Sequence, residues 1–570
     1  MPHFFITTAI DYTNAAPHIG HAYEKVLADV LARYHRLKGD DVFFLTGVDQ
    51  HGQKVQQSAE KQGIAPQEFV DGVTTKFVAL WEKLDVRYDD WAATTDAKHK
   101  DCVRANLQML WDDKVPGTER SRWIYKKAQR GYYSVRQEQF LTDKERNDQG
   151  EFGPEWGQVE EREEENFYFR LTCHEDLGFD PKQWLLDFID QRSAEGRPFV
   201  VPDFRVAELR NAVEKLEGDL CISRPASRLK WGIPFPESFG EGFVTYVWFD
   251  ALVNYITYVP GHDAQFSERA GETNEFAKWW PPVHVIGKDI MIPAHGVYWP
   301  IMLKALGFSD EEMPTLLVHG WWNISGAKMS KSLGNVVDPN QLADKYGAEA
   351  LRYYLMSDIA TGRDADFSEE RLVQRYNTDL ANSLGNLLNR TLSMAQKYRE
   401  GRIRQTPPSA HSVSAEHHVD LYREAIEVNA QHSNAALSVG GEYLIHRALE
   451  AAIGLATRCN ELIDKQKPWT LAKDPGRSDE LDAVLYELVE SLRIIAILIA
   501  PVLPNAARGI FDQLNLTDGL DFKSARWGVL NGSAGPVLED GSSLGLVDDR
   551  HVVGHPRPLF PRIEAPAAET

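Results

Sequence analysis

Several features that decide a protein's class are scarce or missing in this 570-residue sequence. It contains no run of about 18 apolar residues, so no membrane-spanning helix is expected. No charged segment precedes the first apolar stretch, which predicts an initial β-strand rather than a signal peptide and, by default, a cytoplasmic protein. The four cysteines form no Cys-x-x-Cys pair, which excludes a disulfide framework and a four-cysteine zinc knuckle.

The sequence also has fewer basic residues than acidic residues. The formal net charge is −22, whereas a protein that binds nucleic acid regardless of sequence is basic overall. A local basic cluster does run from Arg390 to Arg404, interrupted by one acid, Glu400. Composition therefore argues against general nucleic-acid binding. It leaves two interpretations of the cluster open, a specific RNA contact or a solvated helix end.

Apolar periodicity predicts an α/β fold at the N-terminal end. Residues 4–10 and 42–46 are β-prone runs, and between them an apolar stripe from Ala22 to Tyr34 predicts a helix that ends at Gly39. Strands alternating with helices favour a doubly wound parallel sheet, in which ligands bind beyond the carboxyl ends of the strands. The Gly-x-Gly-x-x-Gly pattern is missing after the first strand, so a nucleotide would have to be held in another way.

From residue 116 onward the pattern of apolar and polar residues changes three times. From 116 to 242 short aromatic pieces alternate with polar loops, which predicts an insertion into the α/β domain. The sheet pattern then resumes at residues 244–249, 284–287 and 316–320. Helical periodicity dominates from about 370 to 516, and the last 50 residues show little of it.

The start of the first helix contains a candidate phosphate site. His18 and His21 are three positions apart, so both imidazoles are expected on one helix face. Pro17 suits a first helical turn, and Gly20 leaves room for a planar base against the backbone. Since a helix N-terminus attracts phosphate, these residues predict an ATP site with two imidazole donors. A His-x-x-His pair alone is common at helix starts.

A second candidate lies in the polar loop at residues 328–332, Lys-Met-Ser-Lys-Ser. Lys328 and Lys331 could converge on a polyphosphate, and a loop allows them to close only when ATP is bound. A lysine pair in a loop is otherwise usually solvated. The occurrence of both motifs in one chain favours the catalytic interpretation.

Together the two motifs resemble those of the class I aminoacyl-tRNA synthetases, and among these the enzymes for methionine. Residues 18–21 match the HIGH signature and residues 328–332 match KMSKS. The resemblance extends through 44–52, 319–322, 332–339 and 558–564 and so covers nearly the whole chain. It implies that ATP, with Mg²⁺, converts L-methionine to methionyl-adenylate and pyrophosphate, and that the methionyl group then passes to the 3′-terminal adenosine of tRNA(Met).

The resemblance also implies roles for individual residues. The catalytic group would be His18, His21, Lys328 and Lys331. ATP would also contact Gly20, Gly287 and Asp289, the last at the family's ribose position. Methionine would be bound by Ile10, Tyr12, Asp49, Trp248, Tyr255 and His295, with Asp49 facing the α-ammonium. The anticodon would be read by Asn386, Arg390 and Trp469.

The same resemblance divides the chain into six parts. In chain order they are the first half of a Rossmann-like catalytic domain at 1–115, a connective insertion without a zinc knuckle at 116–242, the second catalytic half at 243–323, the KMSKS loop and stem-contact region at 324–370, an all-α anticodon-binding domain at 371–520, and a tail that packs back on the body at 521–570.

Three departures from the family are visible. Many relatives bind zinc in the insertion through Cys-x-x-Cys, but Ser134 and Gln137 occupy those positions and neither is a useful zinc ligand, so no structural metal is expected. The stretch from Lys288 to His295 is one residue longer than the usual spacing. No extra tRNA-binding domain follows Glu564, which favours a monomer.

Several alternatives remain open. A related class I synthetase for another apolar amino acid, such as isoleucine, leucine or valine, shares both signatures, but its editing domain would not fit between residues 21 and 328 beside most of the sheet. The cysteine enzyme would need zinc ligands that are not apparent. A nucleotidylyltransferase would leave the chain beyond Glu370 unexplained. An inactive RNA-binding relic would have no need of the intact catalytic residues.

Overall fold

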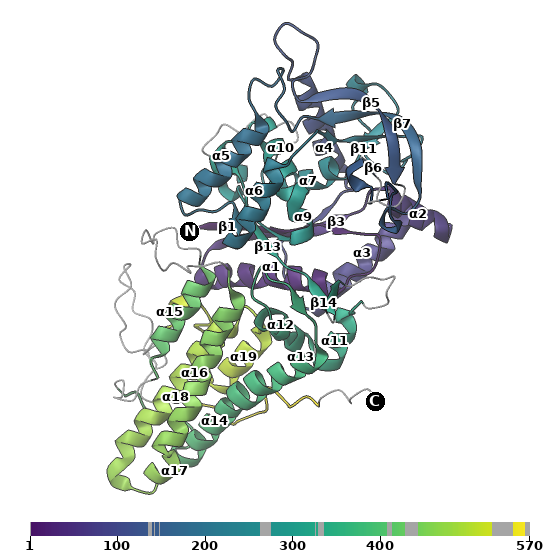
Figure 1. The fold of residues 1–570 in the computed structure, drawn as a ribbon. Coiled ribbons are helices and arrows are strands. Elements are labelled where there is room, and N and C mark those ends of the chain that lie inside the picture. The colour runs from purple at the N-terminus through teal and green to yellow at the C-terminus, as the bar shows by residue number, and fades with distance from the viewer. Residues whose placement is uncertain are drawn as a thin grey trace.

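The structure is a computed structural model of the chain. It describes residues 2–134, 139–141, 143–147, 149–262, 275–324, 326–328, 336–406, 413–427, 443–526 and 551–564. Two residues singled out from the sequence, Gln137 and Lys331, lie outside this set. Figure 1 shows a central sheet with a mixed subdomain above it and a long helical part below it.

The central sheet is parallel throughout. Its strands are β1 (His3–Thr8), β2 (Asp11–Tyr12), β3 (Asp41–Asp49), β4 (Asp90–Ala93), β8 (Val200–Val201), β12 (Val283–Gly287) and β13 (Thr315–His319). The order runs β3-β1-β12-β13-β8, with β2 and β4 both paired to β3. The predicted doubly wound parallel sheet is therefore confirmed. Its edge strand β8 comes from the range expected to be an insertion.

Alternate residues of each strand enter different cores, because successive side chains of a strand point to opposite faces. Ile6 of β1 packs on the side of helix α1 (Ile19–Lys38), whereas Phe5 packs on the side of α4 (Ala97–Asp112) and α7 (Trp248–Thr257). Helix α1 ends at Gly39, as predicted, with a left-handed φ of 96°. Pro17 lies before the helix rather than in its first turn, since His18 is the N-cap.

One predicted strand of the central sheet is wrong. In the run at 244–249 only β11 (Phe243–Thr245) is extended, and it pairs antiparallel with β10 (Ser223–Pro225) outside the central sheet. Helix α7 begins at Trp248. A short apolar run has the same composition in a buried helix as in a buried strand, so periodicity could not separate the two.

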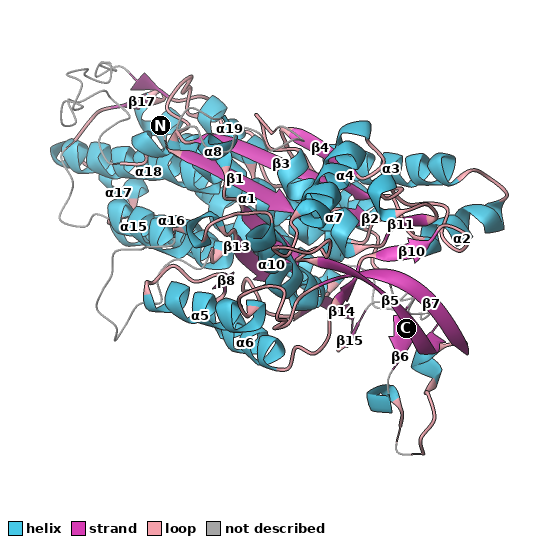
Figure 2. Cartoon of the chain, turned by 90° about the horizontal axis from the view of Figure 1, so that it is seen from above, coloured by secondary structure: helices cyan, strands magenta, loops and turns pink. Residues whose placement is uncertain are grey.

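The insertion is a second, antiparallel sheet with helices beside it. Its strands lie in the order β6-β5-β7-β9, with the long pair β5 (Ile124–Ser134) and β7 (Val159–Phe169) as its main hairpin. The remaining members are β6 (Gln139–Leu141), β9 (Leu220–Cys221), α5 (Pro181–Ala194) and α6 (Val206–Glu214). Figure 2 shows this hairpin reaching away from the body.

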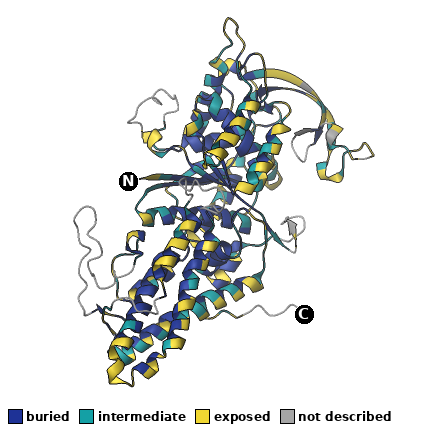
Figure 3. Cartoon of the chain, turned by 60° about the vertical axis from the view of Figure 1, so that its left-hand side comes forward, coloured by how far each residue is buried: buried dark blue, intermediate teal, exposed yellow. Residues whose placement is uncertain are grey.

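The predicted helical region is confirmed. It comprises α13 (Glu369–Arg375), a π-helical turn (Tyr376–Gly385), α14 (Asn386–Arg399), α15 (Ala415–Ile426), α16 (Ile445–Gln466), α17 (Pro468–Leu471), α18 (Ser478–Ile499) and α19 (Pro504–Gln513). Figure 3 shows its interior buried and its far tip exposed. None of the helices in the described ranges is both long and apolar enough to cross a membrane.

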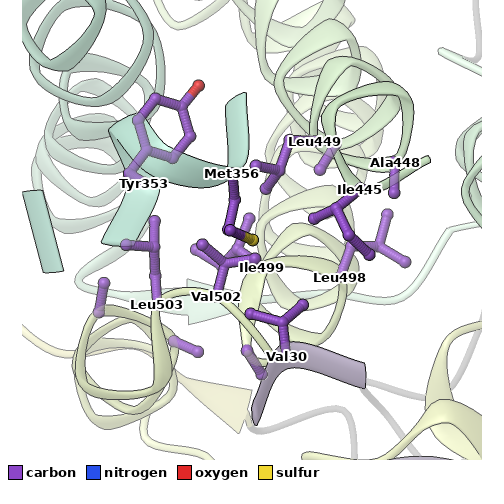
Figure 4. Packing of buried hydrophobic residues seen from close by; sticks show 14 of the residues in the cluster. Val30, Tyr353, Met356, Ile445, Ala448, Leu449, Leu498, Ile499, Val502 and Leu503 are labelled. Atoms are coloured by element: carbon purple, nitrogen blue, oxygen red, sulfur yellow. The ribbon is translucent and has the colours of Figure 1, made fainter. Parts of the chain in front are cut away.

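The helical part and the catalytic sheet share one core. Figure 4 shows Val30 of α1 beside Met356 of α12 (Ala348–Ser357) and Ile499 of α18. At this junction Arg352 is completely buried and donates to Asp29 of α1 at 2.7 Å. It also donates to the carbonyl oxygens of Leu84 at 3.0 Å, Pro501 at 2.9 Å and Val502 at 2.8 Å. One guanidinium thus joins α1 to the end of α18.

The end of the chain runs along the helical part. Strand β18 (His551–Val552) pairs antiparallel with β17 (Arg402–Ile403). Farther on, Asn377 exchanges two hydrogen bonds with the backbone of Ile563, at 2.8 and 3.0 Å.

Candidate active site

A cavity of about 780 Å³ opens at the carboxyl ends of the central strands. Most of the residues predicted to bind ATP or methionine line it, namely Ile10, Tyr12, His18, Gly20, His21, Asp49, Trp248, Tyr255, Gly287, Asp289 and His295. Several of them stand at or just beyond strand ends: Asp49 closes β3 and Gly287 closes β12. The parallel topology therefore collects in one place residues that are far apart in the sequence.

The two motif histidines are oriented by backbone hydrogen bonds. Nδ1 of His18 accepts from the backbone N–H of Gly20 at 3.1 Å, and Nδ1 of His21 accepts from the backbone N–H of His18 at 3.0 Å. An imidazole whose Nδ1 is an acceptor carries its proton on Nε2. Both rings therefore present Nε2–H donors, at the N-terminal end of α1 where phosphate is favoured.

The ring of His18 lies directly against the backbone of Gly20. A Cβ placed there would lie 2.9 Å from Cε1 of His18, closer than carbon atoms normally come. The ring centroids of His18 and His21 are only 3.8 Å apart. A side chain at Gly20 would therefore push His18 out of its hydrogen bond.

Asp49 is a half-buried carboxylate in the same cavity. Burial, together with the nearby charge of Asp250, raises the pKa of Asp49 to about 7, although His51 lowers it. Asp250 is itself held by His51, whose Nδ1 donates to it at 2.8 Å, and by His99, whose Nε2 donates at 2.9 Å. Burial alone would raise the pKa of Asp250, but these two histidines hold it below its usual value. A bound ammonium would be a favourable partner for Asp49.

The apolar end of the cavity contains a neutral histidine. His295 donates from Nδ1 to the carbonyl oxygen of Ile290 at 2.9 Å, and its Nε2 accepts from the hydroxyl of Tyr255 at 2.8 Å. Burial lowers the pKa of His295 to about 4. His295 follows a kink, because Ile292 has extended backbone angles (φ −113°, ψ 126°) and interrupts the helical stretch Met291–Tyr298. Despite the extra residue noted in the sequence, His295 lines the cavity.

The part of the cavity predicted to hold the nucleotide lies at the end of β12. Helix α9 (Lys288–Ile290) follows Gly287 directly and carries Asp289. A Cβ at Gly287 would lie 2.7 Å from Oδ1 of Asp289, so the two positions are packed against each other. His319, at the end of β13, lines the same part of the cavity.

The second phosphate motif is described only at its first residue. Lys328 is the last residue of β15 (Ala327–Lys328). This strand pairs with β14 (Trp322–Ile324), and β14 begins directly after Trp321, which lines the cavity. Lys331 lies outside the described residues. The loop thus begins beside the cavity, and the positions of its two ammonium groups remain a prediction.

The three residues predicted to read an anticodon lie close to one another along two helices. Arg390 donates to Asp464 at 2.6 Å and thereby ties α14 to the end of α16. Asn386 is exposed one turn earlier on α14, and Trp469, 41% exposed, lies on α17 just beyond Asp464. Figure 1 places α17 at the tip of the helical part, far from the sheet.

Several residues at the cavity escaped sequence reasoning. Asp11, Glu24, Lys25, His51, Asp250 and His319 line it or support residues that do. No local signal marked Glu24 and Lys25, because both lie off the apolar stripe of α1, where polar side chains are normally solvated. Among the described residues no group of three or more His, Cys, Asp or Glu side chains could hold a metal ion. Ser134, which occupies one of the positions where relatives have a zinc-binding cysteine, donates a hydrogen bond to the carbonyl oxygen of Trp156 at 2.5 Å.

The family model and the most similar sequences all point to one family of enzymes. The family model described as "tRNA synthetases class I (M)" matches residues 4–149 and 156–392. The methionine–tRNA ligase of Bacillus subtilis is 39% identical over 99% of the chain and 78% of its own length. That of Thermosynechococcus vestitus is 36% identical over 99% of the chain and 98% of its own length.

Solved structures agree with these sequence matches. The Mycobacterium tuberculosis methionyl-tRNA synthetase in complex with methionyl-adenylate superposes with a TM-score of 0.80 at 32% identity, covering 99% of this chain and all of that one. The free form of the same Mycobacterium tuberculosis protein gives a TM-score of 0.75 at 30% identity.

Proposed function

The chain belongs to the class I tRNA synthetases for methionine, and we propose that the cavity at the end of its parallel sheet carries out the chemistry. The overall reaction is methionine–tRNA ligation. L-Methionine is activated by ATP to methionyl-adenylate with release of pyrophosphate, and the methionyl group is then transferred to tRNA. The proposals concern which residues perform each step.

In the first step the methionine carboxylate attacks the α-phosphorus of ATP and pyrophosphate leaves. The carboxylate supplies the electron pair, so no protein nucleophile is needed, and the protein contributes positioning and charge stabilisation. The Nε2–H groups of His18 and His21 would donate to phosphate oxygens, and Lys328 and Lys331 would neutralise charge on the leaving pyrophosphate. Gly20 and Gly287 would leave room for the nucleotide, and Asp289 would hold its ribose. ATP would enter as its Mg²⁺ complex.

Methionine would be recognised at both of its ends. Asp49 would pair with the α-ammonium, while Ile10, Tyr12, Trp248, Tyr255 and His295 would enclose the thioether. A neutral His295 favours this, because a charged imidazolium would be poorly solvated beside sulfur. Aromatic walls add sulfur–ring contacts of about 0.3–1.5 kcal/mol each.

In the second step a hydroxyl of the terminal adenosine attacks the activated carbonyl and AMP leaves. The cognate tRNA(Met) would be selected at the far tip, where Trp469 would stack on a splayed anticodon base and Asn386 and Arg390 would contact base edges. The division into domains at 1–115, 116–242, 243–323, 324–370, 371–520 and 521–570 is part of this proposal. So are a cytoplasmic monomer and an insertion held together without zinc.

The observation that carries the assignment is the pair of Nε2–H donors fixed at the start of α1, in one cavity with the half-buried Asp49. Methionine-dependent exchange of labelled pyrophosphate into ATP tests it. We expect exchange with methionine and far less with isoleucine or leucine. Exchange with another apolar amino acid instead would identify a related class I synthetase. Absence of exchange with every amino acid would indicate an inactive relic.

A further inference from the structure

A chain of buried charges underlies the cavity, with Lys25 at its centre. Lys25 is completely buried, and its three donors are all used. Nζ lies 2.7 Å from Oδ1 of Asp11, 2.8 Å from Oε1 of Glu24 and 2.9 Å from the carbonyl oxygen of Ala9. Fully buried lysines are rare in proteins and depend on partners of this kind. The arrangement is therefore a built feature of this active site.

The chain of charges ends at two imidazoles that line the cavity. On one side Oδ1 of Asp11 is 4.0 Å from Nε2 of His21. On the other side Oε2 of Glu24 accepts from Nε2 of His319 at 3.1 Å, while Nδ1 of His319 donates to the carbonyl oxygen of Gly320 at 2.8 Å. Lys25 thus connects the histidine motif of α1 with the end of β13.

Asp11 also has capacity left over. Its second oxygen, Oδ2, is buried and has no hydrogen-bond partner among the described residues, and Asp11 itself lines the cavity. A buried acceptor without a partner is costly and calls for an explanation. Oδ1 of the same carboxylate lies 4.0 Å from Nε2 of His21, at the start of α1 where the triphosphate would bind.

We propose that Lys25 is a positioning residue for adenylate formation: its ammonium holds Asp11 and Glu24, of which Glu24 orients His319 by a hydrogen bond and Asp11 places its charge beside His21. The inference rests on the proposed function of the cavity. Lys25 itself touches no substrate. Its positive charge favours the ionised forms of both carboxylates against the effect of burial, so that each can act on the imidazole beside it.

The groups that face Asp11 support this role. They are His21, Glu24 and Lys25 on α1 and Tyr255 on α7. Burial raises the pKa of Asp11 to about 7, and Glu24 raises it as well, while Lys25 lowers it. Burial would also raise the pKa of Glu24, but Lys25 and His319 keep it below its usual value. Without Lys25, Asp11 would therefore keep its proton to higher pH and lose its negative charge beside His21.

The first experiment replaces the ammonium with a side chain of similar length. Lys25→Met should lower the rate of pyrophosphate exchange per active site by about 10- to 100-fold at neutral pH, the range found when supporting partners of functional groups are removed. The KM for methionine should change little, because Asp49 is untouched. Active sites are counted from the burst of ATP consumption. Lys38→Met, on the exposed end of the same helix, is the matched control and should behave as wild type.

The second experiment tests Asp11 without disturbing packing. At saturating methionine the wild-type exchange rate should fall as the pH drops below about 7, because Asp11 gains its proton there. Asp11→Asn should be about tenfold slower at pH 8 and should lack this acid limb. The double variant Asp11→Asn, Lys25→Met should be about as slow as Lys25→Met alone, because Asp11 has already lost its charge beside His21 once Lys25 is absent.

The outcomes separate the inference from the function on which it rests. If wild type shows no methionine-dependent exchange, the proposed function fails. If wild type exchanges but Asp11→Asn and Lys25→Met keep its rate per active site and its acid limb, only the positioning role is overturned. Fewer active sites with unchanged turnover and pH profile would indicate a purely structural role and would also overturn it. If Lys25→Met does not fold, Asp11→Asn decides alone.

Discussion

The two proposed binding sites of this molecule are built in opposite ways. In the cavity His18 and His21 each have one ring nitrogen engaged by protein groups, and His295 has both. At the tip of the helical part Trp469 is 41% exposed and Arg390 is held by Asp464 in a solvent-accessible pair. Chemistry requires donors fixed within a fraction of an ångström, whereas stacking on a flexible RNA loop tolerates adjustment.

The largest effect is expected where the two ends join. Arg352→Met leaves Asp29 buried with one partner fewer and three carbonyl oxygens without a donor. Breaking a buried pair of this kind costs about 3–5 kcal/mol. Chemical denaturation should show this loss in the free energy of unfolding. Arg36→Met, which removes an exposed pair from the same helix, should cost about 0–1 kcal/mol, and equal losses for both variants would contradict the role of the junction.

At the catalytic end, His21→Ala removes a preoriented donor. The rate of pyrophosphate exchange should fall by about 10²–10³-fold, as for other preorganised donors, while the affinity for tRNA should stay the same. Exchange kinetics and a filter-binding assay measure the two quantities. A comparable loss of tRNA affinity would mean that the cavity and the tip do not work separately.

At the recognition end, Trp469→Ala should show the reverse pattern. Loss of one base–aromatic stack, worth about 1–3 kcal/mol, should lower the efficiency of tRNA charging and leave exchange unchanged. Trp469→Phe, which retains a stacking face, should recover part of the loss. If both variants impair exchange as much as charging, Trp469 is a packing residue instead.

The smallest effect concerns the charge of Asp49. Its pKa in the free protein is raised to about 7, so the carboxylate is ionised above this pH and neutral below it. Because the methionine ammonium needs the ionised form, the Kd for methionine without ATP should rise about tenfold per pH unit below 7 and stay flat above it. Isothermal titration across pH 5.5–8.5 would show this. Asp49→Asn should bind weakly with no such dependence, and a flat wild-type profile would rule the assignment out.

The sequence was most informative where the signal is local. The end of α1 at Gly39, the strands ending at Asp49 and Gly287 and the helices after residue 370 follow from periodicity and capping, which act over a few neighbouring residues. The same rule misassigned residues 246–249, because an apolar run fits a buried helix and a buried strand alike. It also could not reveal that β8, inside the insertion, completes the central sheet, since strand pairing joins distant segments.

By itself the sequence determined most of the helices and strands, the two signature motifs and the family to which they belong. Only the tertiary structure decided which groups carry protons and charge. The tautomers of His18 and His21, the raised pKa of Asp49 and the ion pairs of Lys25 depend on burial and on partners brought together from separate strands and helices. Spacing along the chain fixes which side chains share a face. Hydrogen-bond geometry and the loss of solvent set their charge, and both arise only when the sheet and α1 pack together.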